Sequence, residues 1–421
     1  MKRRSRRPIT ECYHFDPGVI PSIFLRPQFL RSANALAVAD SVFDIEKTFR
    51  SGGNIQSATI PLFHPKTYGY DLKALRGLLL DLIVFVLAED IRLALKSTKL
   101  ESLTPKEAPS FISARTVCLF SGGADSYAGI LLAQERFKNV AGVFAAHSDQ
   151  GRIIHIVRDI EKTVLATMNI NLHELKVPSV GAQGYAQMRG FLYMVGAAAW
   201  INVLRADTLL VTECGPTMYQ PRFSPFDSIT MTTHPVVVRI ARSVIATLLQ
   251  REVAIVTPFE NLTKAEVLAI SPQKSGLRHT HSCISQRFGT HDGTCYGCVI
   301  RRLAAIAAEV DDVRYSKNPI VDKHASAGNL MSLLTFCYDL LTNYSQMDTY
   351  EVEMIEAYSK QDLFRRFALD NFAAIHRLIQ QGHRVRSPIL QLYRSLIGKI
   401  GTKPLSARLR ELKKAAFVPA F

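Results

Sequence analysis

Three cysteines are spaced as metal ligands often are. Of the seven in the chain, three fall within sixteen positions, where Cys283 is followed by Cys295 and Cys298. The last two form a CxxC pair, and such a pair with a third cysteine is a common zinc framework. These residues therefore predict a zinc site; three buried or redox-active thiols are the alternative.

The hexapeptide SGGADS at 121–126 is suited to binding phosphate. Its two glycines let the backbone approach a ligand without interference from Cβ atoms. The first amide N–H groups of the following helix lack helical partners and, with the helix dipole, attract anions. Ser121 and Ser126 add hydroxyl donors, although the Lys of a Walker A loop is missing. A plain glycine turn, with Asp125 or Ser126 as helix N-cap, is the alternative.

Short apolar runs and helical patterns alternate around these motifs. Strands are predicted at 115–120, 140–146, 171–177, 208–212 and 253–257. Helices are predicted from the hexapeptide to 137, and at 152–168, 186–204 and 236–250. This alternation is typical of an α/β fold, in which helices cover both faces of a parallel sheet.

The alternating pattern covers residues 111–313, which we expect to form the ligand-binding domain, including the cysteine segment 281–302. Residues 1–110 are predicted to form a mixed N-terminal extension, with a helical pattern at 72–95 and a linker at 96–109. Apolar residues recur at intervals of three and four through 327–381. We therefore expect residues 314–421 to form a helical C-terminal region.

The hexapeptide resembles the SGGxDS loop of the PP-loop ATP pyrophosphatases, which bind ATP and transfer AMP to an acceptor oxygen. The resemblance implies a PP-loop core of the adenine nucleotide alpha hydrolase type. It also implies that the loop holds the ATP phosphates together with Mg²⁺, through Ser121, Gly122, Gly123, Asp125 and Ser126.

The same resemblance extends to other segments. The end of the second strand is similar to the segment that contacts adenosine, which implies that His147 binds the nucleotide. PFENLTKAEVLAI (258–270) is similar to a family segment that carries Lys264 and Glu266. YAQMRGFLYMVGAAA (185–199) is similar to a family helix that places Arg189 near the nucleotide, although Gly190 replaces its Asn. A plain amphipathic helix is the alternative for each.

The cysteine segment resembles the zinc site of the 7-cyano-7-deazaguanine synthases, the QueC family. Alignment on GCVIRR puts Cys295 and Cys298 at the last two ligand cysteines and Cys283 at the first. The remaining position falls on Asp292, a departure from the family. Three alternatives stay open for the fourth zinc ligand: Asp292, its neighbour His291, or no fourth protein ligand. We expect zinc to be structural, with His281 and Arg301 lining a substrate pocket nearby.

The resemblance implies an ATP-dependent C–N ligase that adenylates a deazapurine-type carboxylate and passes the acyl group to a nitrogen nucleophile. Enlarged members of this family occur in bacterial anti-phage defence operons, including the Qat systems, and the layout of this chain is most similar to theirs. An amine on a partner protein from the same operon is therefore the expected acceptor. The alternatives are nitrile synthesis with ammonia, tRNA modification and a non-catalytic scaffold.

Composition limits the class of protein and its surroundings. The chain of 421 residues is 48% hydrophobic and carries a net charge of +15. A surplus of that size favours nucleotides, nucleic acid or an acidic partner, with a solvated basic surface as the alternative. No RNA-binding module signature is evident, which makes RNA the less favoured partner. We expect no membrane span. The odd cysteine count, without a secretory signal after MKRRSRR, favours the cytoplasm.

Overall fold

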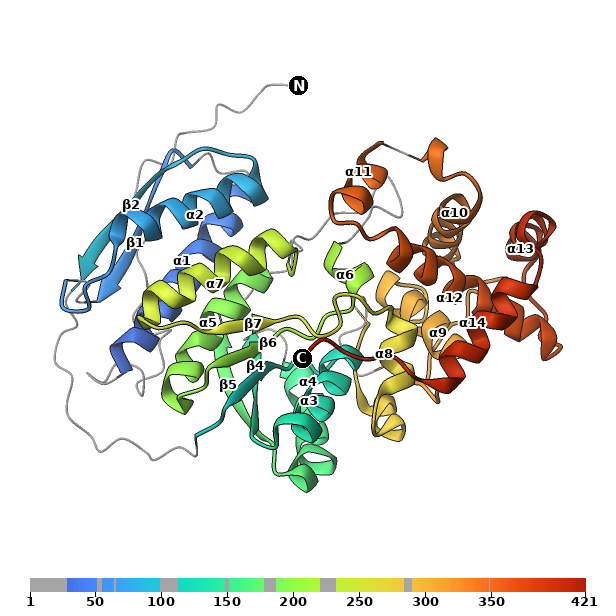
Figure 1. The fold of residues 1–421 in the computed structure, drawn as a ribbon, viewed down its shortest axis with the longest axis horizontal. Coiled ribbons are helices and arrows are strands. Elements are labelled where there is room, and N and C mark those ends of the chain that lie inside the picture. Colours follow the sequence, from blue (N-terminus) through green and yellow to red (C-terminus); the bar gives the residue numbers. More distant parts are fainter. Residues whose placement is uncertain are drawn as a thin grey trace.

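The centre of the molecule is a five-stranded parallel sheet, seen in the middle of the computed structural model (Figure 1). The structure describes residues 29–50, 55–63, 66–98, 113–147, 151–177, 187–219, 232–283, 290–347 and 349–421. The strands are β3 (Thr116–Leu119), β4 (Val140–His147), β5 (Asn171–Val177), β6 (Thr208–Leu210) and β7 (Ala254–Val256). Their order is β5-β4-β3-β6-β7, and every pair is parallel. All five predicted strands are present, so the predicted α/β class with a parallel sheet is confirmed.

Successive residues of the central strands face opposite sides of the sheet, as the pleat requires. In β3, Val117 joins the hydrophobic core on one face and Cys118 the core on the other. Leu209 and Leu210 divide in the same way in β6. Because both faces are buried, these strands consist of continuous apolar runs, which is why they are recognisable in the sequence.

One face of the sheet is covered by α5 (Arg189–Leu204) and α7 (Pro235–Leu249), and α1 (Leu30–Arg50) packs on both helices. The 21-residue helix α1 was not predicted. Its polar residues are buried, which hides the amphipathic pattern that sequence analysis relies on. Ser32 donates to the carbonyl of Ala199, and Asn34 pairs with the backbone of Phe63, so burial leaves these groups satisfied.

A small βαβ unit covers α1 and α7 on the outside. Strands β1 (Ser57–Phe63) and β2 (Arg92–Thr98) pair in parallel, and α2 (Leu72–Leu87) connects them. The predicted helix over 72–95 therefore ends early, at Ala88, which is left-handed with φ of 54°. The predicted linker is wrong for 96–98, which belong to β2; residues 99–112 lie outside the described part of the chain.

The other face is covered by α3 (Ala124–Phe137) and α4 (Gly151–Thr163); α8 (Lys264–Ile270) packs on α3, and α9 (Tyr296–Ala308) packs on α8. Short helical segments complete this part of the molecule: Leu165–Met168, α6 (Gly215–Tyr219) and Lys274–His279. The predicted helix over 152–168 thus consists of α4 and a 3₁₀ turn. The hydrophobic core on this face continues without a break into the C-terminal region.

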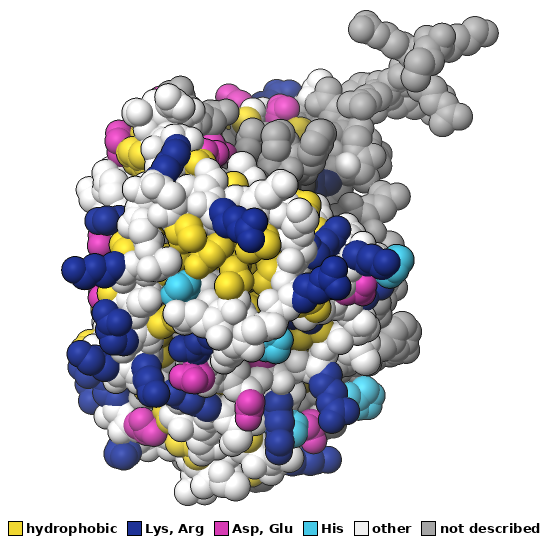
Figure 2. All heavy atoms as spheres, turned by 90° about the vertical axis from the view of Figure 1, so that its right-hand side faces the viewer, with side chains coloured by type: hydrophobic (Ala, Val, Ile, Leu, Met, Phe, Trp, Pro, Cys, Tyr) yellow, Lys and Arg dark blue, Asp and Glu magenta, His cyan; other side chains and the backbone are white. Residues whose placement is uncertain are grey.

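The C-terminal region is helical from residue 328 onward, as predicted. It comprises α10 (Gly328–Thr342), a turn at Tyr344–Gln346, α11 (Thr349–Ala357), α12 (Gln361–Gln380), α13 (Ser387–Ile400) and α14 (Lys403–Lys414). Lys and Arg side chains outnumber acidic ones on the side of the molecule that these helices form (Figure 2). No helix in the described ranges combines the length and apolar character needed to cross a membrane.

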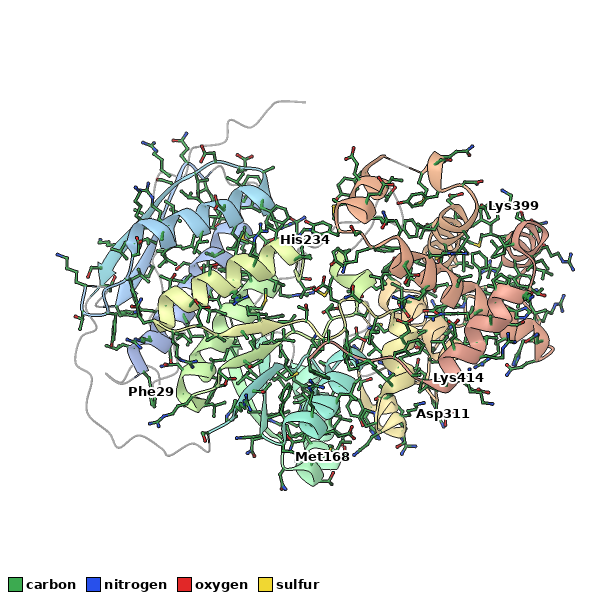
Figure 3. The ribbon with its side chains drawn as sticks, in the orientation of Figure 1. Phe29, Met168, His234, Asp311, Lys399 and Lys414 are labelled. Carbon is green, nitrogen blue, oxygen red and sulfur yellow. The ribbon has the colours of Figure 1, made fainter. Side chains whose placement is uncertain are left out.

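His234, at the start of α7, joins the N-terminal and C-terminal parts of the molecule (Figure 3). Its ring centroid lies 5.1 Å from that of Phe85 in α2 and 5.3 Å from that of Tyr358, between α11 and α12. The ring is 2% exposed, and its Nδ1 accepts the N–H of Val236 as a helix cap. Burial lowers the pKa of His234 to about 4, so the imidazole is neutral at pH 7.

Candidate functional site

The hexapeptide lies at the point where the order of strands reverses. In the sheet, β3 lies between β4, which is the next strand along the chain, and β6. In open parallel sheets, ligands bind beyond the carboxyl ends of the two strands that meet at such a switch point. Residues 121–126 follow β3 directly, and residues 211–214 follow β6. The strand order therefore brings these two segments to the same edge of the sheet.

The loop is held in shape by its own hydroxyl groups. Gly122 has φ of 75°, a left-handed value that favours glycine. The N–H of Ser121 donates to Ser126 Oγ, which in turn donates to the carbonyl of Gly123. Ser121 Oγ and Ser126 Oγ lie 3.2 Å apart. The two serines thus fix the turn from both ends.

Neither Asp125 nor Ser126 caps the following helix, so the plain capped-turn interpretation is wrong. The N-cap of α3 is Gly123, which has no side chain to offer, and no side-chain capping bond is present. The first N–H groups of α3 therefore keep their donor capacity at the end of the helix that is positive. This arrangement is suited to an anion.

Asp125 forms a buried ion pair across the site. Its Oδ2 lies 2.5 Å from Lys264 Nζ, and the two side chains are 8% and 14% exposed. Burial opposes a charged ammonium, but Asp125, together with Cys214 and Glu213, raises the pKa of Lys264. Asp125 Oδ1 is buried and has no hydrogen-bond partner among the described residues. One carboxylate oxygen thus remains to bind a cation or a donor.

Glu213, three residues beyond the end of β6, belongs to the same cluster of charges and was not predicted. Burial, followed by repulsion from Asp125, raises the pKa of Glu213, while Lys264 and Arg189 act in the opposite direction. Arg189 thus lies within electrostatic reach of Glu213. The signal that could have identified Glu213 is its place at the carboxyl end of a predicted central strand.

Arg189 is positioned by the N-terminal helix α1. Glu46 of α1 is fully buried, and its carboxylate accepts the N–H groups of Gln187 and Met188, at 2.5 and 2.8 Å. These residues immediately precede Arg189, the first residue of α5. At Gly190, an added Cβ would lie 1.6 Å from the carbonyl oxygen of Thr232. The close backbone approach explains why this position has no side chain.

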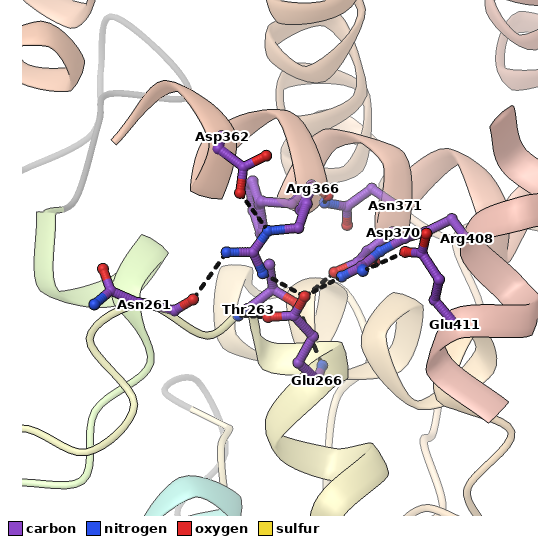
Figure 4. A network of polar contacts seen from close by, with 10 residues as sticks. Asn261, Thr263, Glu266, Asp362, Arg366, Asp370, Asn371, Arg408 and Glu411 are labelled. Atoms are coloured by element: carbon purple, nitrogen blue, oxygen red, sulfur yellow. Dashed lines mark hydrogen bonds and ion pairs between the residues drawn. The ribbon is translucent and has the colours of Figure 1, made fainter. Parts of the chain in front are cut away.

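Lys264 is positioned by a network that joins α8 to the C-terminal helices (Figure 4). Thr263 and Glu266 form a capping box at the start of α8. Glu266 is fully buried and pairs with Arg366 of α12 and, at 2.5 Å, with Arg408 of α14. Arg408 also binds Asp370 at 2.6 Å. Glu266 is thus a structural residue that fixes the helix carrying Lys264.

The predicted metal residues form one compact group. The ligand atoms of Cys283, Asp292, Cys295 and Cys298 all lie within 4.8 Å of one another. Cys283 Sγ and Cys295 Sγ are 3.8 Å apart, too far for a disulfide. Two sulfurs each about 2.3 Å from a tetrahedral zinc ion would lie about 3.8 Å apart. The donor set and its spacing fit a metal ion such as zinc.

Asp292 is the fourth member of the group, and His291 is not. Burial alone would raise the pKa of Asp292, but backbone N–H groups of Cys295 and Thr294 donate to the carboxylate and lower it to about 2. The ring Nε2 of His291 instead accepts the N–H of Ser282, at 3.1 Å. The structure therefore favours Asp292 as the fourth metal ligand, a question that the sequence left open.

The cysteine segment is hydrogen-bonded to the hexapeptide. The N–H of His281 donates to the carbonyl of Gly122, at 2.8 Å, and His281 Nε2 lies 2.9 Å from the carbonyl oxygen of Cys283. One residue therefore contacts both the loop and the metal-ligand segment. His281 therefore lies next to the hexapeptide, and its predicted place in a substrate pocket stays a prediction.

Arg301 does not line a pocket, so that expectation is wrong. Its side chain is 1% exposed and its Nε donates to Asp312 at 2.7 Å. Its terminal nitrogens donate to the carbonyls of Thr280 and Leu277. Arg301 therefore holds the segment that leads to His281. His147 ends β4 at the same edge of the sheet, but its side chain lies outside the described part of the structure.

The chain matches no model of a known protein family, and comparison with curated proteins finds no match either.

Proposed function

We propose that the chain is a QueC-like PP-loop enzyme, an AMP-forming ligase that activates a carboxylate with ATP and transfers the acyl group to a nitrogen nucleophile. The observation that carries the proposal is the Lys264–Asp125 ion pair beside a glycine loop at the switch point of a parallel sheet. A loop with free amide donors at a helix N-terminus suits the pyrophosphate that leaves. The nearby cationic side chains of Lys264 and Arg189 suit the negative charge of the pyrophosphate.

Each residue has a role in the proposed chemistry. The loop from Ser121 to Ser126 would hold the β- and γ-phosphates, and Asp125, whose Oδ1 has no partner among the described residues, would be a ligand of Mg²⁺. Lys264 pairs with Asp125 and holds its carboxylate in place. Arg189 neutralises charge on the nucleotide. Mg²⁺ supplies charge neutralisation when bound.

The reaction is balanced in two steps. A substrate carboxylate oxygen attacks the α-phosphorus, and the bond to pyrophosphate breaks, giving an acyl adenylate. An amine then attacks the acyl carbon, AMP leaves with the electron pair, and the amine proton passes to solvent. We propose a deazapurine-type carboxylate as substrate and an amine on a partner protein as acceptor, in anti-phage defence. The alternatives are ammonia, which gives the nitrile synthase, and tRNA.

The metal is a structural zinc ion in this proposal. It is held by Cys283, Asp292, Cys295 and Cys298, a closed set of four protein ligands. Through His281 it stabilises the loop at Gly122. Removing the zinc ion is expected to weaken nucleotide binding. It would not remove a catalytic group, because the ion takes no part in the proposed reaction.

The experiment that tests the acceptor is intact-mass spectrometry of operon neighbours after incubation with ATP and a carboxylate-bearing deazaguanine. The proposal expects a mass increase on one neighbour that requires ATP and is absent with Asp125→Ala. Rapid turnover with ammonium, with no modified protein, would favour the nitrile synthase instead.

A further inference from the structure

The positive charge of the chain is concentrated at its C-terminal end. After Asp370, the sequence contains ten Lys and Arg residues and one acidic residue, Glu411. These 51 residues therefore carry nine of the fifteen net positive charges. The proposed ligase chemistry uses none of them, and the structure describes all of them.

Helix α14 separates its basic residues into a buried one and an exposed row. Arg408 faces inward, is 2% exposed, and is neutralised by Glu266, Asp370 and Glu411. Leu405 and Leu412 lie on the same inward face and are buried. The inward face of the helix is therefore fully accounted for by packing and ion pairing.

The opposite face of α14 carries Lys403, Arg410 and Lys414, all exposed. At 100° per residue, these three positions lie within about 40° of one another around the helix axis. They extend over about 16 Å along it. The side chain of Lys414 is labelled on this helix in Figure 3. None of the three forms an ion pair with another described residue.

We propose that this row, which we call the α14 basic face and define as Lys403, Arg410 and Lys414, binds the phosphate backbone of a nucleic acid duplex. Three unpaired cations in a straight row match a regular row of phosphates better than they match a single anion. Lys and Arg contacts to phosphate release counterions, which provides affinity without reading sequence.

The composition of α14 favours a duplex over a single strand. No aromatic residue lies among 403–414, whereas proteins that bind single strands combine basic grooves with aromatic side chains for base stacking. Arg410 and the two lysines also offer only donors, as phosphate contacts require. DNA and RNA duplexes share this phosphate chemistry, and the experiment distinguishes them.

The α14 basic face lies one helix away from the candidate site. Arg408, on the inner side of α14, binds Glu266 of α8, the helix that begins with Lys264. A duplex bound outside α14 would therefore lie next to the catalytic region without entering it. Binding does not require ATP turnover, so this proposal and the proposed function can fail separately.

The test is fluorescence anisotropy with a labelled 25-base-pair DNA duplex of arbitrary sequence and with the RNA duplex of the same sequence, over 50–200 mM NaCl. The test variant is Lys403→Gln/Arg410→Gln/Lys414→Gln. The matched control is Lys73→Gln/Arg76→Gln/Lys96→Gln, which removes the same charges from exposed positions on the other side of the molecule. Circular dichroism verifies that both variants are folded.

The wild type and the control are expected to bind with equal, steeply salt-dependent affinity. Losing three phosphate contacts should reduce the log–log salt slope of the test variant by about 2.7. A fourfold rise in salt should then weaken the wild type about 40-fold more than the variant. Tighter binding of one duplex identifies the natural form. An unchanged slope in the test variant, an equal loss in the control, or equal competition by poly-glutamate would overturn the proposal.

Discussion

Replacing Lys264 by methionine should destabilise the protein through the carboxylate that it leaves behind. Asp125 is 8% exposed and its Oδ2 lies 2.5 Å from Lys264 Nζ. Removing one partner of a buried pair leaves an uncompensated charge, which typically costs about 3–5 kcal/mol. Because both side chains are nearly buried, we expect Lys264→Met to lower the free energy of unfolding by about 3 kcal/mol or more.

The double variant separates this effect from lost packing. In Asp125→Asn/Lys264→Met, neither charge remains, so most of the stability should return, and the two changes should be strongly non-additive. The assay is urea unfolding at pH 7.5, with the free energy taken from midpoint and slope. The double variant should still fail to bind ATP. A single-variant loss below about 1 kcal/mol, or additive effects, would refute the ion-pair reasoning.

Three further predictions concern other parts of the molecule. The pKa of His234 is lowered to about 4, so its stabilising contribution is present above pH 6.5 and is lost as the pH falls toward 4. The free energy of unfolding of the wild type should fall by about 3 kcal/mol over this pH range. His234→Asn, which keeps a capping group, should abolish this pH dependence, as measured by urea unfolding. Cys298→Ser should lose bound zinc in elemental analysis, whereas Cys337→Ser, outside the cluster, should keep it. Gly122→Ala should cost about 1–2 kcal/mol and weaken ATP binding in calorimetry, whereas Gly382→Ala, at a similar φ with open space around it, should leave ATP binding unchanged.

The parts of the fold that sequence analysis predicted are those with strong local signals. The central strands are buried on both faces, so runs such as those around Val117 and Leu209 are apolar without interruption. In the C-terminal helices apolar residues recur at intervals of three and four, which gives a clear helical period. The cysteine cluster was predictable because its members are close in sequence and of unusual type.

The parts that escaped prediction depend on long-range partners. In α1, Ser32, Asn34 and Glu46 are buried because groups far along the chain satisfy them, and nothing in the local pattern reveals those groups. Glu213 becomes a site residue only when β6 pairs with β3. Arg301 resembles a pocket residue in sequence, but the carbonyls that it binds appear only once the segment before His281 has folded against it.

The measurement that tests the central claim most directly is product analysis of ATP turnover. The full-length protein is incubated with ATP, Mg²⁺ and a carboxylate-bearing deazaguanine, and the nucleotides are separated by anion-exchange chromatography. The account predicts AMP and pyrophosphate in equal amounts, and no such products with Asp125→Ala, with Ser121→Ala as a second variant of the loop. ADP and phosphate as the products, or AMP formation that survives Asp125→Ala, would contradict it.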